Sequence, residues 1–353
     1  MINVDPRHAN TRLTALYGKE GLGNFMYRPI KWIRQTDKYE TLRKVLAIAI
    51  TILLCCTILG LFIVIPGITE WNRQSNKGIK IPSDNTVPVI NPISTSLAKF
   101  DNLTVKGQVN GLYITTNETN LAATDEFLKA HPPREQTLHL GCANWYNFDI
   151  MCKRKSNYGL IVDFNPKNAA FIKKTIEIVK ASESREVFTS TIITYLNSLH
   201  GKERNLFFHG DQQGLPTDRI EKELCREGSW LENEESYAFI KNLASNEQII
   251  AITENITNHK KFSKIREFLD LNHILIDTVY LSNICNFMQT KDEKEAFSKS
   301  VTNIVDNNTI FISCPKIKQS NNQTKILHQH SILGSEILEK EFDHLLLFEL
   351  VRD

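Results

Sequence analysis

The hydrophobic pattern of the chain contains one long apolar run and, much later, short apolar runs that alternate with helix-like segments. The long run covers residues 45–65, VLAIAITILLCCTILGLFIVI, without a charged residue or Pro. At about 1.5 Å per residue, a helix of this length crosses a hydrocarbon core of about 30 Å. We therefore predict a transmembrane helix over residues 45–66. A core helix or signal peptide fits less well, because the run is apolar on all faces and starts late.

Basic residues are distributed unevenly around the predicted span. Lys and Arg are frequent in residues 1–44 and sparse after the span, where Arg73, Lys77 and Lys80 come first. Because the cytoplasmic flank of a membrane helix retains the excess of Lys and Arg, this pattern predicts a cytoplasmic N-terminus. We expect the large C-terminal part to be extracytoplasmic, on the periplasmic side of a bacterial inner membrane.

The pattern divides the chain into five parts. Residues 1–44 form a basic tail, residues 45–66 the span, and residues 67–100 a linker rich in Asn, Ser, Pro and Thr. Residues 101–135 form a lead-in, with a hairpin predicted over 103–116 and a short helix over 118–130 that ends before Pro132 and Pro133. Residues 136–353 form the main domain.

Short apolar runs alternate with amphipathic stretches in the main domain. Strands are predicted at residues 137–141, 158–164, 248–253, 274–283 and 309–314. Helices are predicted from Pro166, with Asn165 as its cap, and at 185–199, 217–227, 232–245, 260–270 and 292–305, and a closing pair of strands at 326–333 and 345–351. Strands that alternate with long helices favour a parallel sheet covered on both faces. The predicted fold class is α/β, with a doubly wound, mostly parallel Rossmann-like sheet.

Charge and cysteine content exclude several partners. The net charge is only +2 and no Lys/Arg stripe with interleaved aromatics follows the tail, so we expect no nucleic-acid partner. The seven cysteines form no CxxC pair or zinc-like spacing, and we expect no metal. Cys142 and Cys152 could pair in an oxidising compartment, and the sequence leaves this open. Cys285 and Cys314 lie in apolar stretches and are predicted as core residues.

Candidate site residues follow the predicted strands, because open α/β sheets bind ligands outside the carboxyl ends of their strands. Asp163 ends the second strand, about twenty residues after a Gly that ends the first, where a carboxylate can hold a ribose diol. It could equally be a solvated carboxylate before the Asn165 cap. The residues singled out by this argument are Gly141, Asn144, Asp163, Glu254, Ser282 and Asn283.

The order of these segments resembles a known family. The stretches TLHLGCANW, LIVDFNPKNA, IIAITENIT, IDTVYLSNICNF and TIFISC resemble the layout of class I S-adenosylmethionine-dependent methyltransferases over residues 136–351. The resemblance implies S-adenosylmethionine as cofactor. It places Gly141 and Asn144 in the cofactor turn, Asp163 at the ribose and Glu254 at the adenine. The polar motif facing the methyl group would be Ser282 and Asn283, the candidate catalytic residues.

The turn after the first strand departs from the pattern of that family. GCANWYNFD has one Gly where the family has a richer turn, and we expect Trp145 and Tyr146 to fill the pocket. S-adenosylmethionine is also made in the cytosol, across the membrane from the predicted position of the domain. One hypothesis is therefore a catalytically degenerate domain that binds protein partners or assists assembly in a bacterial envelope complex. The alternative is an active methyltransferase anchored to the membrane.

Other enzyme classes have less support. His209 and Asp211 in a predicted loop could serve acid/base chemistry, but such residues are common in plain turns. The sequence has no G-x-S-x-G elbow and no P-loop. The order of tail, anchor, stem and domain is also that of type II lumenal transferases, although no D-x-D motif supports this class.

Overall fold

The computed structural model describes residues 91–105, 111–207, 215–314 and 328–339. The chain separates into two compact units, Met1–Pro88 and Val89–Asp353, and all described residues belong to the second. The basic tail, the predicted transmembrane helix and most of the predicted linker lie outside the described residues. Among the helices of the described part, none combines the length and the apolar character needed to span a membrane.

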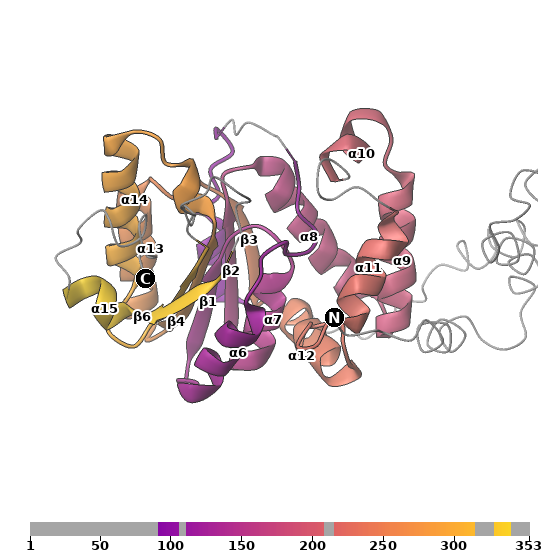
Figure 1. The fold of residues 1–353 in the computed structure, drawn as a ribbon, viewed down its shortest axis with the longest axis horizontal. Coiled ribbons are helices and arrows are strands. Elements are labelled where there is room, and N and C mark those ends of the chain that lie inside the picture. Colours follow the sequence, from indigo (N-terminus) through magenta and orange to yellow (C-terminus); the bar gives the residue numbers. More distant parts are fainter. Residues whose placement is uncertain (1–90, 106–110, 208–214, 315–327, 340–353) are drawn as a thin grey trace, which may run out of the picture. The chain divides into compact units, whose positions relative to one another are not determined.

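Six strands in the described residues form one sheet, in the order β3-β2-β1-β4-β5-β6 (Figure 1). Strands β1 to β5 are parallel to their neighbours, and β6 is antiparallel to β5. The order reverses between β1 and β4, as in Rossmann-type sheets. This confirms the predicted α/β class and its mostly parallel sheet. The strands are β1 (Thr137–Gly141), β2 (Tyr158–Asp163), β3 (Ile249–Thr253), β4 (Leu275–Ser282), β5 (Ile310–Ser313) and β6 (His330–Leu333).

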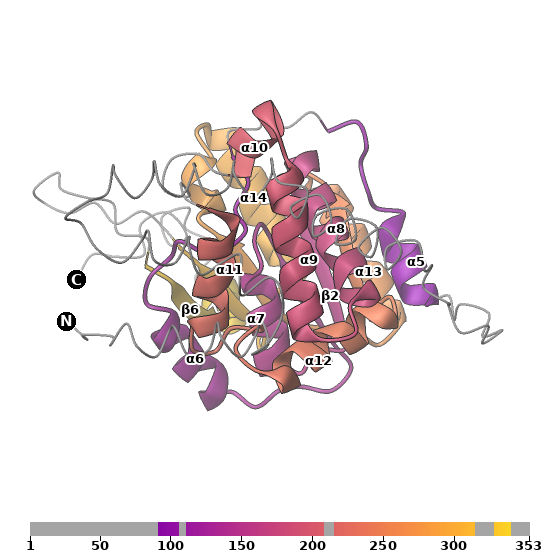
Figure 2. The same ribbon diagram turned by 90° about the vertical axis from the view of Figure 1, so that its right-hand side faces the viewer.

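Helices cover both faces of this sheet, with α13 and α14 on one side and α8, α9 and α11 on the other (Figure 1). Seen from the second side, α9 and α11 lie next to each other in an outer layer (Figure 2). The helices are α5 (Pro92–Ala98), α6 (Leu121–Ala130), α7 (Tyr146–Arg154), α8 (Pro166–Ala181), α9 (Arg185–Ser198), α10 (Gly201–Phe207), α11 (Pro216–Cys225), α12 (Glu234–Ser245), α13 (His259–Leu271), η3 (Ile284–Phe287), α14 (Lys291–Ile304) and α15 (Gly334–Glu339).

The local sequence explains why several helices begin where they do. Asn165 accepts a hydrogen bond from the backbone of Lys167, and Pro166 occupies the first turn of α8. Thr290 and Glu293 form a reciprocal capping box at the start of α14. These caps satisfy backbone N–H groups that have no partner within the helix.

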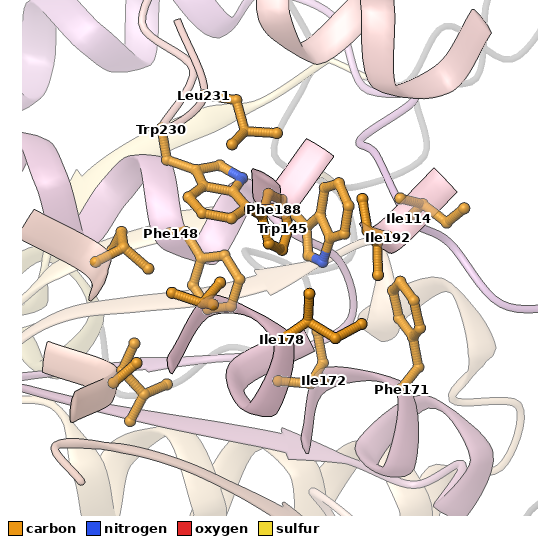
Figure 3. Packing of buried hydrophobic residues seen from close by; sticks show 14 of the residues in the cluster. Ile114, Trp145, Phe148, Phe171, Ile172, Ile178, Phe188, Ile192, Trp230 and Leu231 are labelled. Atoms are coloured by element: carbon orange, nitrogen blue, oxygen red, sulfur yellow. The ribbon is translucent and has the colours of Figure 1, made fainter. Parts of the chain in front are cut away.

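Two apolar layers result, one on each face of the sheet. Against α13 and α14, Leu138 and Leu140 of β1 pack with Phe262 and Phe297. The other layer contains an aromatic cluster between α7, α8, α9 and the segment before α12 (Figure 3). Its rings lie 5.0 to 6.1 Å apart in stacked, tilted and edge-on pairs, which favours tight packing. The labelled aromatic members are Trp145, Phe148, Phe171, Phe188 and Trp230.

Buried ion pairs tie the strands to the helical layer. Arg154 of α7 donates to both carboxylate oxygens of Asp277, at 2.6 and 3.0 Å, and to the carbonyls of Leu128, His131 and Pro132. A second group joins α7 to α11, where Arg226 contacts both Asp149 and Glu223 at 2.5 Å. Burial raises the pKa of Asp149 to about 7, although Arg226 opposes the shift. Both groups place charge where solvent cannot reach it, so they depend on complete pairing.

The lead-in differs from its prediction. The described parts of the predicted hairpin, residues 103–105 and 111–116, contain no strand, and the following helix begins at Leu121 instead of residue 118. The end of the predicted linker forms helix α5, with Asn91 as its cap and Leu97 fully buried. The structure also contains α7, α10, η3 and α15, which the sequence pattern did not predict. Their short length gives hydrophobic periodicity too few residues to be recognised.

Candidate functional site at the carboxyl edge of the sheet

A segment of the chain itself runs along the carboxyl edge of the sheet. We call residues 111–120 the covering segment. The backbone N–H of Trp145, in the loop after β1, donates to the carbonyl of Ile114 at 3.0 Å. Further along, the N–H of Gln329 donates to the carbonyl of Thr119 at 3.1 Å, beside β6. The segment therefore passes from the end of β1 to the far side of β4, over the position where the strand order reverses.

The Asn147 side chain lies so close to the backbone at position 141 that only glycine fits there. A Cβ atom at this position would lie 1.8 Å from Oδ1 and 2.9 Å from Cγ of Asn147. The Asn147 amide nitrogen donates to the carbonyls of Cys142 and Asn144 at 2.9 and 2.6 Å, so the turn after β1 closes around this side chain. The absent Cβ of Gly141 thus makes room for Asn147.

His139 completes the hydrogen bonding around Asn147. Because the Asn147 amide nitrogen donates to carbonyls, its Oδ1 accepts, and His139 Nε2 is the donor at 3.0 Å. His139 Nδ1 then accepts from the Thr278 hydroxyl at 2.7 Å. Burial lowers the pKa of His139 to about 4, so the ring is neutral at ordinary pH and serves as a link between β1, β4 and α7.

The residues after Gly141 are buried and hydrogen-bonded within the protein. Asn144 accepts from the backbone N–H of Tyr146 at 2.9 Å, which organises the start of α7. Trp145 belongs to the aromatic cluster and donates from Nε1 to Thr175 at 3.2 Å. Tyr146 packs edge-on against Tyr280 of β4. Trp145 and Tyr146 are thus fully buried beside the end of β1, and their filling of a cofactor pocket stays a prediction.

Asp163 ends β2 as predicted, and it organises the start of α8. One carboxylate oxygen accepts from the backbone N–H of Asn165 at 2.7 Å, and the other accepts from the amide of Asn168 at 2.6 Å. Burial raises the pKa of this carboxyl, and hydrogen bonds from Asn165, Asn168 and the backbone of Ala143 oppose the shift. The residue as a whole is half-buried, and both carboxylate oxygens already have protein partners. Asp163 is therefore not the solvated carboxylate of the second interpretation, and the ribose contact stays a prediction.

Glu254 follows β3 and pairs with a lysine. Its carboxylate lies 2.6 Å from Nζ of Lys261 in α13 and accepts from the backbone of Asn255 at 2.9 Å and from the Asn102 amide at 3.3 Å. Its own backbone N–H donates to the carbonyl of Asp163 at 3.0 Å, which joins the ends of β2 and β3. The carboxylate is buried and held by these groups, which leaves it poorly placed for an adenine.

Ser282 and Asn283 lie at the end of β4, where the register with β5 shifts. Ser282 has a left-handed backbone, with φ of 51°, and its hydroxyl donates to Glu118 in the covering segment. Asn283 precedes η3 without capping it through its side chain. The Ser282 hydroxyl thus faces the covering segment and is already hydrogen-bonded to a carboxyl group of the same chain.

Three further predictions have mixed outcomes. Cys142 and Cys152 are both free, buried thiols, and they belong to the apolar layers on opposite faces of the sheet. Cys285 and Cys314 are buried, as predicted for core residues. His209 and Asp211 lie outside the described residues.

Sequence reasoning missed Glu118 and Asn147, which shape this edge more than the predicted ligands do. Glu118 was assigned to a helix, and its partner Ser282 lies 164 residues away. Asn147 contacts Gly141 directly, but it lies in α7, a short helix that the pattern did not predict. Only the unusual turn after Gly141, poor in Gly and rich in large side chains, pointed to a filled edge.

Comparison with known proteins supplies a family. Residues 113–198 and 212–332 match the family described as Domain of unknown function (DUF7790). The chain belongs to this family. A sequence comparison with curated proteins finds no match.

Among solved structures, the chain is similar to the rRNA methyltransferase aviRa from Streptomyces viridochromogenes. The 2.4 Å structure of that protein has 12% sequence identity and a TM-score of 0.36, over 71% of this chain and 96% of the other. The 1.5 Å structure gives the same identity and TM-score, over 70% and 94% of the two chains.

Proposed function

We propose that this DUF7790 protein is a methyltransferase-like binding domain without catalytic activity, held at a membrane by the span predicted at residues 45–66. In this proposal the domain binds protein partners, or assists their assembly, in a bacterial envelope complex. The observation that carries the proposal is the filled space at Gly141. Where a cofactor would need to approach the backbone, the Asn147 side chain already lies against it.

The other residues of the edge support the same conclusion. S-adenosylmethionine needs a carboxylate for its ribose and an open acid beside its adenine, but Asp163 is bonded to Asn165 and Asn168 at the start of α8, and Glu254 pairs with Lys261. Ser282, the candidate beside the methyl group, donates to Glu118. If the cofactor took over one of these side chains, the protein group that now pairs with it would be left buried and unpaired. Each such loss costs about 1–3 kcal/mol. The residues present therefore do not fit this cofactor.

We predict that the full-length protein in detergent does not bind S-adenosylmethionine or S-adenosylhomocysteine with micromolar affinity. Calorimetric titration measures this directly. Micromolar binding that disappears in Asp163→Ala would overturn the proposal and favour the alternative, a membrane-anchored S-adenosylmethionine-dependent methyltransferase. The position of Asp163, a half-buried residue at the end of β2, is the observation that supports this alternative.

The membrane topology has its own test. The excess of Lys and Arg before residues 45–66 predicts that the C-terminus lies outside the cytoplasm. We expect a reporter that is active only outside the cytoplasm to work when fused after Asp353. The matched fusion to a reporter that works only in the cytoplasm should be inactive. The reverse result would place the domain beside the cytosolic cofactor and would contradict the proposed orientation.

A further inference from the structure

Glu118 is a buried carboxyl group that connects three parts of the carboxyl edge. It lies in the covering segment and is only 7% exposed. One of its oxygens accepts from the hydroxyl of Ser282 at the end of β4, and the other accepts from the amide of Gln329 at 2.6 Å. Gln329 in turn accepts from the hydroxyl of Tyr146 in α7 at 3.1 Å. The covering segment, β4, α7 and the residue before β6 thus meet at this carboxyl.

No cation lies opposite Glu118 among the residues that the structure describes. The titratable groups that face it are Tyr146 from α7, Tyr280 from β4 and Cys314 after β5. Burial raises the pKa of all three, so they stay neutral over the ordinary pH range. Tyr280 is fully buried, and its hydroxyl is a further hydrogen-bond donor toward Glu118. Next along the segment, the Thr119 hydroxyl lies 3.1 Å from Nδ1 of His328.

A carboxylate without a cation beside it is unfavourable in such surroundings, and the neutral acid is preferred. In the neutral acid the oxygen beside Ser282 carries the proton and donates it to that hydroxyl, while the other oxygen still accepts from Gln329. Burial raises the pKa of Glu118 above its ordinary value of 4.5, and the bonds from Ser282, Gln329 and Tyr280 oppose the shift only in part. In the released segment, where solvent reaches the carboxyl, the pKa returns toward 4.5. A proton is therefore bound more tightly when the segment is closed. Closure is strongest at low pH and weakens as the pH rises from the ordinary value toward the raised one.

We propose that Glu118 is a proton-controlled latch, which holds the covering segment on the carboxyl edge while it keeps its proton and releases the segment when the proton passes to solvent. The inference rests on the proposed function, since it describes how access to that same edge is regulated. Release uncovers the hydroxyls of Ser282 and Tyr280 in β4. The apolar end of the segment stays anchored, because Leu112 and Ile114 are buried in the aromatic layer.

Backbone hydrogen exchange at defined amides tests the latch in the full-length protein in detergent. The amide of Gln329, which donates to Thr119, reports on the latch, and the amide of Leu112, which donates to Leu206, reports on the anchored end. After correction for the intrinsic exchange rate, we expect the opening equilibrium at Gln329 to rise with pH. While the closed form keeps its proton, the rise should approach about tenfold per pH unit, the slope for one released proton. Leu112 should show no such rise.

Variants assign the response to Glu118. Glu118→Gln keeps the shape and cannot ionise, so the opening equilibrium at Gln329 should become independent of pH. His328→Gln removes the nearby imidazole and should leave the response in place. Ser282→Ala removes a donor to the carboxylate and raises the pKa of the closed form, so the response should extend to higher pH while its onset stays the same. A response that survives in Glu118→Gln, or is absent from a folded wild-type protein, would overturn the latch.

Different experimental results would disprove the latch and the proposed function. Hydrogen exchange without the expected pH response removes the latch and leaves the cofactor titration unaffected. Micromolar binding of S-adenosylmethionine removes the non-catalytic domain, even where the pH response at Gln329 is present. The two experiments therefore identify which inference is wrong.

Discussion

Arg154→Ala is expected to lower the free energy of unfolding by about 3–5 kcal/mol, the usual cost of removing one partner of a buried ion pair. Arg154 is only 2% exposed and bonds Asp277 through two of its nitrogens. Without it, Asp277 would remain buried with Arg134, at 3.3 Å, as its cationic partner among the described residues, and three backbone carbonyls would lose a bond from Arg154. Urea unfolding followed by Trp fluorescence measures the loss, because Trp145 and Trp230 are fully buried.

Two comparison variants make this result specific. Lys129→Ala removes a pair with Glu126 in which both side chains are largely exposed, and the unfolding midpoint should stay unchanged. Arg154→Met combined with Asp277→Leu removes both buried charges and should recover much of the stability lost in Arg154→Ala. A folded Arg154→Ala protein as stable as the wild type would show that the ion pair does not hold β4 to α7.

Gly141→Ala is expected to cost about 3 kcal/mol even in the absence of any ligand. The new Cβ would lie 1.8 Å from Asn147 Oδ1 and 2.7 Å from His139 Nε2, so both side chains would have to move. Displacing Asn147 also breaks its bonds to Cys142 and Asn144, which adds unpaired buried groups to the cost of overpacking. The same urea unfolding experiment measures the loss. A glycine needed only for a cofactor would tolerate Ala in the free protein.

A double-mutant cycle tests the cause. Removing the displaced side chain should relieve the clash, so Gly141→Ala/Asn147→Ala should be less destabilised than the sum of its single variants by about 1–3 kcal/mol. Gly111→Ala is the matched control, because its Cβ would meet only the Leu206 carbonyl at 3.6 Å, an ordinary contact. If the losses in unfolding free energy of the two single variants simply add, Gly141 and Asn147 do not interact. That result would weaken the argument for a filled edge.

Local sequence patterns predicted most of the sheet. Strand β1 matches its prediction at both ends, and β2, β3, β4 and β5 differ by one or two residues. The apolar runs were decisive because central parallel strands are buried on both faces. The start of α8 was predicted by Asn165 and Pro166, since a cap and a first-turn Pro act within a few residues. Such features need no knowledge of the rest of the chain.

The sequence by itself determined the α/β class, the position of the candidate residues at the strand ends and the unusual turn after Gly141. Only the tertiary structure decided what those residues contact. Glu118 meets Gln329 across 211 positions, and Arg154 meets Asp277 across 123, so no local spacing could indicate either pair. Hydrophobic periodicity shows which face of an element is buried. The partner of a buried polar side chain depends on how distant elements pack, and that decides whether an edge is open to a ligand or filled by the chain itself.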